Sequence, residues 1–352
     1  MRVLIWVYVA TSVYNCGAPA PAPPSCRELV DAEQWAAALP RCSVAYDGSR
    51  DPRSGLGAAR AAYYLQKCEA AERFARALIP GPEAANAEFV LGGCALMQRE
   101  LDTARDHLQR AMAMHEQDGK LAEQARDAHQ LAGVWFARGE YLKGFEALKV
   151  ARDAAVRASD ARMQVYVDIA ASDFHRAVGD RRTAEQEIGR AVAEARDPGT
   201  LATAHLKEGI FQIEAGLLGP AQSTFERALI EERRLQMPRP QHVVGALLNL
   251  AYLDRKAGTA DGLARALERV EEAHRLEGDE MSYRLNRGMV LAELGRLAEA
   301  TADLRAAEAA GPTGEWSWWV PYQAALVATK AGDLQGAIEA CGRSIAKVTE
   351  LA

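Results

Sequence analysis

Small and large apolar residues recur along the chain in one fixed pattern. A small residue is followed by an apolar residue four positions on and by a second small residue three further, as in Ala184, Ile188 and Ala191. Residues at these intervals lie on one face of an α-helix, where the small side chains let a neighbouring helix approach closely. The set returns around Leu108, Leu148, Phe225, Val270, Leu304 and Cys341, and more weakly around Cys42 and Phe74. The pattern therefore predicts a long series of packed helices.

Most copies of the pattern follow a glycine by five residues. These glycines are Gly139, Gly179, Gly216, Gly295 and Gly332; Gly258 opens a copy with three extra residues, and Arg99 takes the glycine's place upstream. A glycine ends a helix at low cost because it readily adopts a left-handed conformation. A small residue also stands seven positions before the glycine, as at Gly209 and Gly288. We therefore expect helix pairs whose first helix lies closely against the second.

These recurring residues resemble the tetratricopeptide repeat family over residues 27–350. The glycine-to-glycine steps of 40, 37, 42, 37 and 37 residues exceed the family's usual repeat of about 34 residues. The resemblance implies an all-α fold, a right-handed α-solenoid of antiparallel helix pairs. We expect about eight repeats, of which the first two are degenerate. Pro80-Gly81-Pro82 reads as a turn between pairs, and Asp47–Gly57 as the longest polar loop.

The N-terminus has the composition of an export signal. Arg2 is followed by the apolar stretch Val3–Val13, and a Pro/Ala-rich tether over 16–26 comes next. Residues 1–15 with Cys16 resemble a bacterial lipoprotein leader, in which that cysteine would be acylated, although Tyr14 and Asn15 stand where the family prefers small residues. A membrane-anchored lipoprotein is therefore expected. An ordinary signal peptide, giving a periplasmic protein, and a cytoplasmic protein are the alternatives.

Four further cysteines are spaced for two bridges across helical hairpins. Cys26 and Cys42 lie eight residues either side of Gln34, and Cys68 and Cys94 thirteen either side of Gly81. If each centre is a turn, each pair faces across its hairpin, where a disulfide can close. Two disulfides and an unpaired Cys341 then account for the cysteines of an exported protein. The alternative is a reduced protein in which all of them are small buried residues.

The composition does not favour nucleic-acid binding or catalysis. The net charge is −6, with 26% charged residues and no Lys/Arg block of the kind that follows phosphates. The sequence has no phosphate-binding glycine loop, serine-hydrolase motif, zinc-protease motif or metal-ligand cysteine spacing, and its seven histidines are scattered. We expect no enzyme activity, no metal and no cofactor.

The family resemblance implies that the first helix of each pair lines a concave groove. Nine residues before the glycines stand Gln130, Ala170, Lys207, Asn249, Asn286 and Gln323. In the family an asparagine here hydrogen-bonds the backbone of an extended ligand, because an amide both donates and accepts. Nearby inward positions hold Asp173, Arg176, Tyr252 and Arg255, and the arginines are candidates for clamping a carboxylate. A solvated groove with ordinary polar residues is the alternative.

An aromatic cluster follows near the C-terminus. It contains Trp316, Trp318, Trp319 and Tyr322. Pro321 suits the first turn of a helix, so the tryptophans are expected on the segment before it. Trp319 on that segment, and Tyr322 directly after Pro321, would be candidate interface anchors. The alternative is that the cluster folds back onto the core.

The sequence thus predicts a non-catalytic scaffold or assembly factor that binds a protein or an extended peptide in its concave groove, at the bacterial cell envelope. The alternative is a sensor array that regulates an effector enzyme, such as a caspase-like protease, encoded separately or in a longer parent chain. The last helix presents Ile338, Cys341, Ile345 and Val348 at intervals of three and four. This edge would dock a partner or a second copy, or continue into a longer parent chain.

Overall fold

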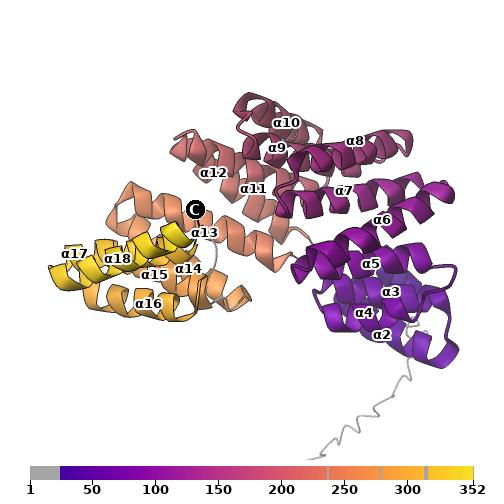
Figure 1. Ribbon diagram of the computed structural model, residues 1–352, viewed down its shortest axis with the longest axis horizontal. Coiled ribbons are helices and arrows are strands. Elements are labelled where there is room, and N and C mark those ends of the chain that lie inside the picture. Colours follow the sequence, from indigo (N-terminus) through magenta and orange to yellow (C-terminus); the bar gives the residue numbers. More distant parts are fainter. Residues whose placement is uncertain (1–23, 236–237, 278–279, 313–315, 352) are drawn as a thin grey trace, which may run out of the picture. The chain divides into compact units, whose positions relative to one another are not determined.

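The computed structural model describes residues 24–235, 238–277, 280–312 and 316–351. The predicted leader, Cys16 and most of the tether lie outside these residues. The described residues contain eighteen α-helices and no strand (Figure 1). They divide into two compact units, which meet in the sequence between Glu83 and Ala84. No helix within the described ranges is long and apolar enough to cross a membrane.

Over residues 24–83, unit 1 contains four helices that pack in sequence order. They are α1 (Cys26–Asp31), α2 (Trp35–Ser49), α3 (Pro52–Tyr64) and α4 (Cys68–Arg76). A disulfide joins Cys26 of α1 to Cys42 of α2 across the turn at Gln34, as the spacing predicted. Cys68 begins α4, whereas Cys94 lies in a helix of unit 2. Their pairing stays a prediction.

The loop expected over Asp47–Gly57 is wrong, because most of that segment is helical. Only Arg50 and Asp51 separate α2 from α3. The Asp51 side chain accepts a hydrogen bond from the Ser54 backbone N–H at 2.9 Å, and Pro52 occupies the first turn. An acidic N-cap followed by proline starts a helix, since proline's missing N–H is not needed there. A segment rich in polar residues is here a helix start.

Unit 2 contains fourteen helices in the described ranges, which pack as seven consecutive pairs. They are α5 (Ala84–Met97), α6 (Leu101–Gln117), α7 (Leu121–Ala137), α8 (Tyr141–Arg157), α9 (Ala161–Ala177), α10 (Arg181–Glu194), α11 (Pro198–Glu214), α12 (Leu218–Arg233), α13 (Pro240–Ala257), α14 (Ala260–Glu277), α15 (Glu280–Glu293), α16 (Leu297–Ala309), α17 (Trp316–Lys330) and α18 (Leu334–Leu351).

The turns inside the pairs have the predicted chemistry. Gly139, Gly179, Gly216, Gly258, Gly295 and Gly332 all have positive φ between 67° and 85°. Arg99, which replaces the glycine in the first pair of unit 2, adopts the same conformation with φ 66°. Each pair therefore ends its first helix on a left-handed residue, as the sequence pattern predicted.

The repeating residues form the core between the helices of unit 2. In one cluster Ala184, Ile188 and Ala191 of α10 pack with Val165 and Ile169 of α9, all of them buried. The corresponding Ala300, Leu304 and Ala307 of α16 pack with Leu285 of α15 and Val320 of α17. Each second helix therefore contacts both its own partner and the first helix of the next pair, which propagates the array.

Candidate functional site

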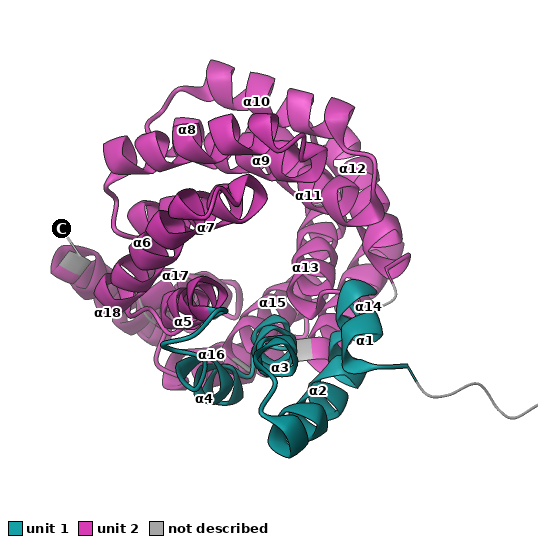
Figure 2. Ribbon diagram, turned by 90° about the vertical axis from the view of Figure 1, so that its right-hand side faces the viewer, with its two compact units in different colours: residues 1–83 teal, residues 84–352 magenta. Residues whose placement is uncertain are grey.

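The first helices of the pairs form one continuous inner face. Contacts between helices two apart in the described part of unit 2 join α5 to α7, α7 to α9 and so on to α17, and none join second helices. Figure 2 shows α9, α11 and α13 on the inner side of the curve, with α10, α12 and α14 outside them. Because the array curves toward the first helices, these helices lie close together on its concave side. We call the surface of α7, α9, α11, α13, α15 and α17 the inner face.

Asn249 and Asn286 occupy equivalent places on this face, one repeat apart. Both side chains are half-buried. The Asn249 Nδ2 donates to the Gly245 carbonyl at 2.8 Å, and the Asn286 Nδ2 donates to the Ser282 carbonyl at 2.8 Å. In both cases the acceptor is the backbone carbonyl four residues earlier, so the two amides are held in the same way. Each amide keeps a carbonyl oxygen and a second N–H, the two groups that a peptide backbone requires.

The predicted groove residue Lys207 and the two predicted clamps, Arg176 and Arg255, are already in ion pairs between repeats. Lys207 of α11 contacts Asp173 of α9 at 2.7 Å, and Arg176 of α9 contacts Glu214 of α11 at 3.1 Å. Further along, Arg255 lies 3.9 Å from Glu293 of α15. Partly exposed pairs of this kind contribute about 0–1 kcal/mol. A ligand carboxylate would therefore compete with Glu214 or Glu293, at a small cost in stability.

Half-buried apolar side chains lie beside the asparagines. Tyr252 of α13 packs on a cluster with Leu206 and Ile210 of α11. The guanidinium carbon of Arg255 and the Lys256 ammonium each lie 5.7 Å from the Tyr252 ring centroid. Gln130 of α7 and Gln323 of α17 occupy the position of the two asparagines and are half-buried too. The inner face thus combines amides, paired charges and apolar surface.

The aromatic cluster lies on a helix and not on a connecting segment, which corrects the sequence-based expectation. Trp316 begins α17, and Pro321 lies inside the helix at its sixth residue. A proline at this position removes only one backbone hydrogen bond of the helix, because only its own N–H is missing. Trp319 packs partly on the core of α15–α17, and its ring centroid lies 5.5 Å from that of Tyr322. Of the two proposed anchors, Tyr322 is the more exposed.

Comparisons with known proteins agree with this architecture. No family model matches the sequence, and no curated protein sequence is similar to it. The structure is similar to a Rap protein complexed with Competence and Sporulation Factor, with TM-score 0.65 and 17% identity over 93% of this chain and 97% of that one. It is also similar to the apo form of the quorum sensor NprR from B. thuringiensis, with TM-score 0.63 and 13% identity over 90% and 97%.

A third solved structure is Cut9 in the APC/C hetero-tetramer Cut9-Hcn1, with TM-score 0.63 and 13% identity over 86% of this chain. The present chain spans about half of it, 54%. At these identities the likeness defines the fold. The chain folds as a tetratricopeptide-repeat-like α-solenoid.

The solenoid also contains buried carboxylates that the sequence analysis did not identify. Asp168, Asp254 and Asp303 are each buried and paired with two arginines: Arg152 and Arg190, Arg265 and Arg269, and Arg284 and Arg287. For Asp254 and Asp303 the missed signal is an aspartate on one helix of a pair and two arginines, three or four residues apart, on the other. These networks join helices and leave the carboxylates inaccessible to a ligand.

A histidine–aspartate pair lies between α6 and α7. His115 Nδ1 and Asp127 Oδ2 are 2.6 Å apart, and both side chains are 0% exposed. Burial raises the pKa of Asp127 against the opposing hydrogen bond from His115. No substrate can reach a pair enclosed in this way, so it is a packing element. Within the described residues there is also no cluster of three side chains suited to a metal ion.

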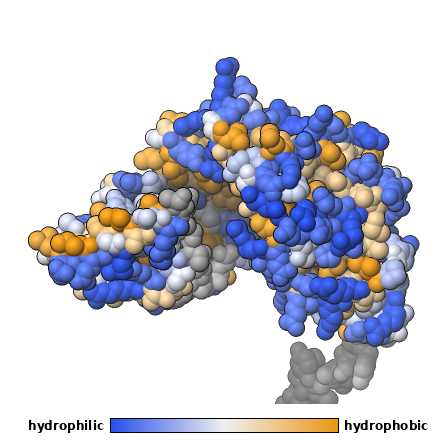
Figure 3. Space-filling model, in the orientation of Figure 1, coloured by the Kyte–Doolittle hydropathy of each residue, from blue (hydrophilic) through white to orange (hydrophobic). Residues whose placement is uncertain are grey.

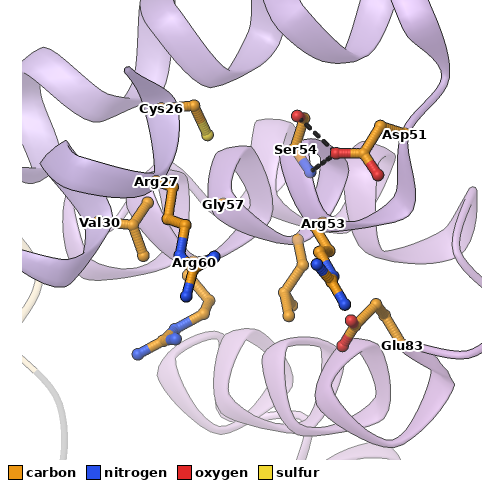
Figure 4. A pocket seen from close by; sticks show the side chains of 10 residues that line it. Cys26, Arg27, Val30, Asp51, Arg53, Ser54, Gly57, Arg60 and Glu83 are labelled. Carbon is orange, nitrogen blue, oxygen red and sulfur yellow. Dashed lines mark hydrogen bonds between the residues drawn. The ribbon is translucent and has the colours of Figure 1, made fainter. Parts of the chain in front are cut away.

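Unit 1 has a half-open pocket of about 420 Å³ between α1 and α3. Figure 4 shows the side chains of Arg27 and Arg60 side by side in it, with Arg53 reaching toward Glu83. Asp51, at its rim, is held by the Ser54 hydroxyl at 2.8 Å. Arg27 is 83% exposed at the pocket's edge. Because water already solvates the charge of Arg27, an anion would gain little binding free energy by entering this pocket.

Proposed function

We propose that the protein is a non-catalytic scaffold that holds an extended peptide, or an extended segment of a partner protein, on the inner face of unit 2. The observation that carries the proposal is the matched pair of Asn249 and Asn286. Their amides are held by identical 2.8 Å bonds one repeat apart. An extended backbone presents N–H and C=O groups repeatedly, so it can be bonded at two such points.

The similar solved structures support a binding role. The Rap protein is complexed with Competence and Sporulation Factor, and it shares this fold over nearly its whole length. NprR, which shares the fold as well, is a quorum sensor. That name favours the alternative in which this solenoid is a sensor: a bound ligand would change how the array contacts an effector enzyme. Both versions place the ligand on the inner face.

Cell location forms a separate part of the proposal. The lipoprotein-like leader supports export and anchoring through Cys16 at the envelope, and the Cys26–Cys42 disulfide is typical of an oxidising compartment. Intact-mass spectrometry of protein purified from its native host tests this. A chain beginning at acylated Cys16 agrees with the proposal, whereas a reduced chain beginning at Met1 would make it a cytoplasmic scaffold.

Self-association through α18 completes the proposed partners. Leu334, Ile338, Cys341, Ile345 and Val348, which we call the α18 stripe, are all exposed. Figure 3 shows hydrophobic side chains gathered at the left-hand end, over α17 and α18. The intervals of four, three, four and three residues are those of a helix–helix seam.

The α18 stripe is suited to meeting itself. Its residues are spaced nearly symmetrically about Cys341, so an antiparallel second copy would set Leu334 against Val348 and Ile338 against Ile345. Gln335, Gly342 and Thr349, which flank the seam, are uncharged, so no like charges would face each other. We therefore favour a second copy over an unrelated protein at this surface.

The binding proposal is tested by selection and cross-linking. Peptides selected from a random phage-displayed library on the purified protein are synthesised with a photoreactive residue at each end. Cross-links on α11, α13, α15 or α17 are the expected result. Cross-links confined to the outer helices α10, α12 and α14, or no enriched peptide at all, would contradict the proposal.

A further inference from the structure

A small cavity opens between α13 and α15 beside the two asparagines. Its volume is about 100 Å³, and its lining includes Leu248 of α13, Ala273 and His274 of α14, and Ser282 and Tyr283 of α15. Leu248 and Ser282 are half-buried on the first helices, whereas Ala273 is buried on the second helix. The cavity is therefore bounded by two first helices, α13 and α15, and by the second helix α14.

Two residues of the cavity lining lie close in the chain to the amides of the proposed groove. Leu248 precedes Asn249 in the chain, and the Ser282 carbonyl is the acceptor of the Asn286 amide at 2.8 Å. A peptide bonded at both asparagines would thus cross the mouth of the cavity. The side chain that it carries there has the cavity beneath it.

The aromatic wall of the cavity is fixed before any ligand arrives. The His274 and Tyr283 rings are stacked, with centroids 4.0 Å apart and 15° between their planes. Arg287 donates to the Tyr283 hydroxyl oxygen at 2.6 Å and is itself held by Asp303 at 2.6 Å. Because Asp303 is buried on α16, the ring is braced by the partner helix of α15. A preorganised wall of this kind loses little entropy on binding.

The size of the cavity restricts what it can hold. A cavity of about 150 Å³ accommodates benzene, so 100 Å³ is too small for an aromatic side chain. Valine, leucine and alanine side chains, together with the two aromatic rings, provide apolar contacts, and the lining contains no lysine, arginine, aspartate or glutamate. A branched aliphatic side chain fits both the volume and the chemistry.

We propose that this cavity is a specificity subsite that takes a valine, leucine or isoleucine side chain of the bound peptide. The inference rests on the proposed function, because it requires a peptide on the inner face. It adds a sequence preference to the backbone recognition by Asn249 and Asn286: one aliphatic residue at a fixed position, next to the two backbone contacts.

The test compares the sequences of phage-displayed random peptides selected on the wild-type protein and on three variants. Leu248→Ala widens the mouth, and Ala273→Leu fills the cavity from below. Leu142→Ala is the control, since Leu142 is an exposed leucine of the outer helix α8 and does not line this cavity. Circular dichroism and thermal melts verify that each variant is folded. Leu248→Ala keeps the test decisive if Ala273→Leu does not fold.

The wild-type protein should enrich peptides with one aliphatic residue at a fixed position, and replacing it by alanine should weaken binding about ten- to hundred-fold. Leu248→Ala should shift the preference toward methionine and phenylalanine, Ala273→Leu should abolish it, and Leu142→Ala should retain it. If peptides bind through the asparagines but Leu248→Ala leaves the preference unchanged, the subsite is wrong and the groove stands. If wild-type protein enriches no peptide, both proposals fail.

Discussion

Gly209 of α11 lies so close to the Phe225 ring of α12 that a Cβ atom on Gly209 would be 2.7 Å from it. This contact is the reason for the small residue seven positions before the turn glycine. The same arrangement recurs at Gly288, where a Cβ would lie 3.1 Å from Leu304. Close approach of the two helices in a pair therefore depends on the absence of a side chain.

Gly209→Ala should destabilise the fold. Alanine gains about 1 kcal/mol of helix propensity, but overpacking against a buried ring costs about 1–3 kcal/mol. Because Phe225 is 0% exposed and has little room to move, we expect a net loss of about 1 kcal/mol in the free energy of unfolding. Chemical denaturation measures it.

The matched control for that substitution is Gly189→Ala in α10. Gly189 is exposed, and apart from the adjacent residues and the backbone of its own helix no heavy atom lies within 4 Å of an added Cβ. Only the propensity gain remains there, so stability should rise by about 1 kcal/mol. Equal effects of the two substitutions would refute the packing explanation.

Glu232 at the end of α12 should make the fold sensitive to acid. Burial raises its pKa, but hydrogen bonds from His242 and from the side chain and backbone of Arg239 outweigh burial and lower the pKa from 4.5 to about 2. A depressed carboxyl pKa stabilises the fold above pH 4.5, and this contribution is lost as the pH falls toward 2. The shift corresponds to about 3 kcal/mol.

Denaturation measured between pH 7 and pH 2 tests this contribution. The free energy of unfolding should fall less steeply with acid in Glu232→Gln than in the wild-type protein. Glu194→Gln, at an exposed position of α10, removes a carboxylate without removing the network and should keep the wild-type slope. A wild-type slope in Glu232→Gln would show that the Glu232–Arg239 pair does not stabilise the fold.

Self-association should depend on the α18 stripe. Light scattering after size-exclusion chromatography should give a dimer for the wild-type protein at micromolar concentration. The double variant Ile338→Lys/Ile345→Lys should be a monomer, because it would place lysines in the seam where uncharged residues meet. Ala346→Lys adds a charge on the same helix outside the stripe and should remain dimeric. A monomeric wild-type protein would exclude the dimer.

The sequence predicted the regular part of the fold because that part is determined locally. The roles of the turn glycines and of the small residues at helical intervals follow from the sequence of a single helix pair. Even Arg99, where the glycine is missing, could be placed, and its φ of 66° agrees with that position. The repeat register therefore carries most of the information about the array.

Side-chain pairs between different helices were less predictable. Asp303 is paired with Arg284, nineteen residues earlier. Neither residue considered alone predicts this ion pair. The segment around Gly57 was misread as a loop, although glycine is needed there for packing: a Cβ would lie 2.9 Å from the sulfur atoms of both Cys26 and Cys42. Polar and glycine-rich composition cannot distinguish a loop from a closely packed helix start.

The inner-face residues were predicted as positions, whereas their partners required the structure. The equivalence of Asn249 and Asn286 followed from the repeat register. The pairing of Arg176 with Glu214, at 3.1 Å, did not, because it joins successive repeats. Because of this pairing, Arg176 can bind a ligand carboxylate only by giving up its ion pair with Glu214.

The most direct test of the central claim is the affinity of a selected peptide for wild-type protein and for the double variant Asn249→Ala/Asn286→Ala, measured by isothermal titration calorimetry. Gln222→Ala, at a half-buried position of the outer helix α12, is the control. Losing the amide bonds should weaken binding by about 1–3 kcal/mol without changing the melting temperature appreciably. Unchanged affinity in the double variant would contradict recognition of an extended peptide by the inner face.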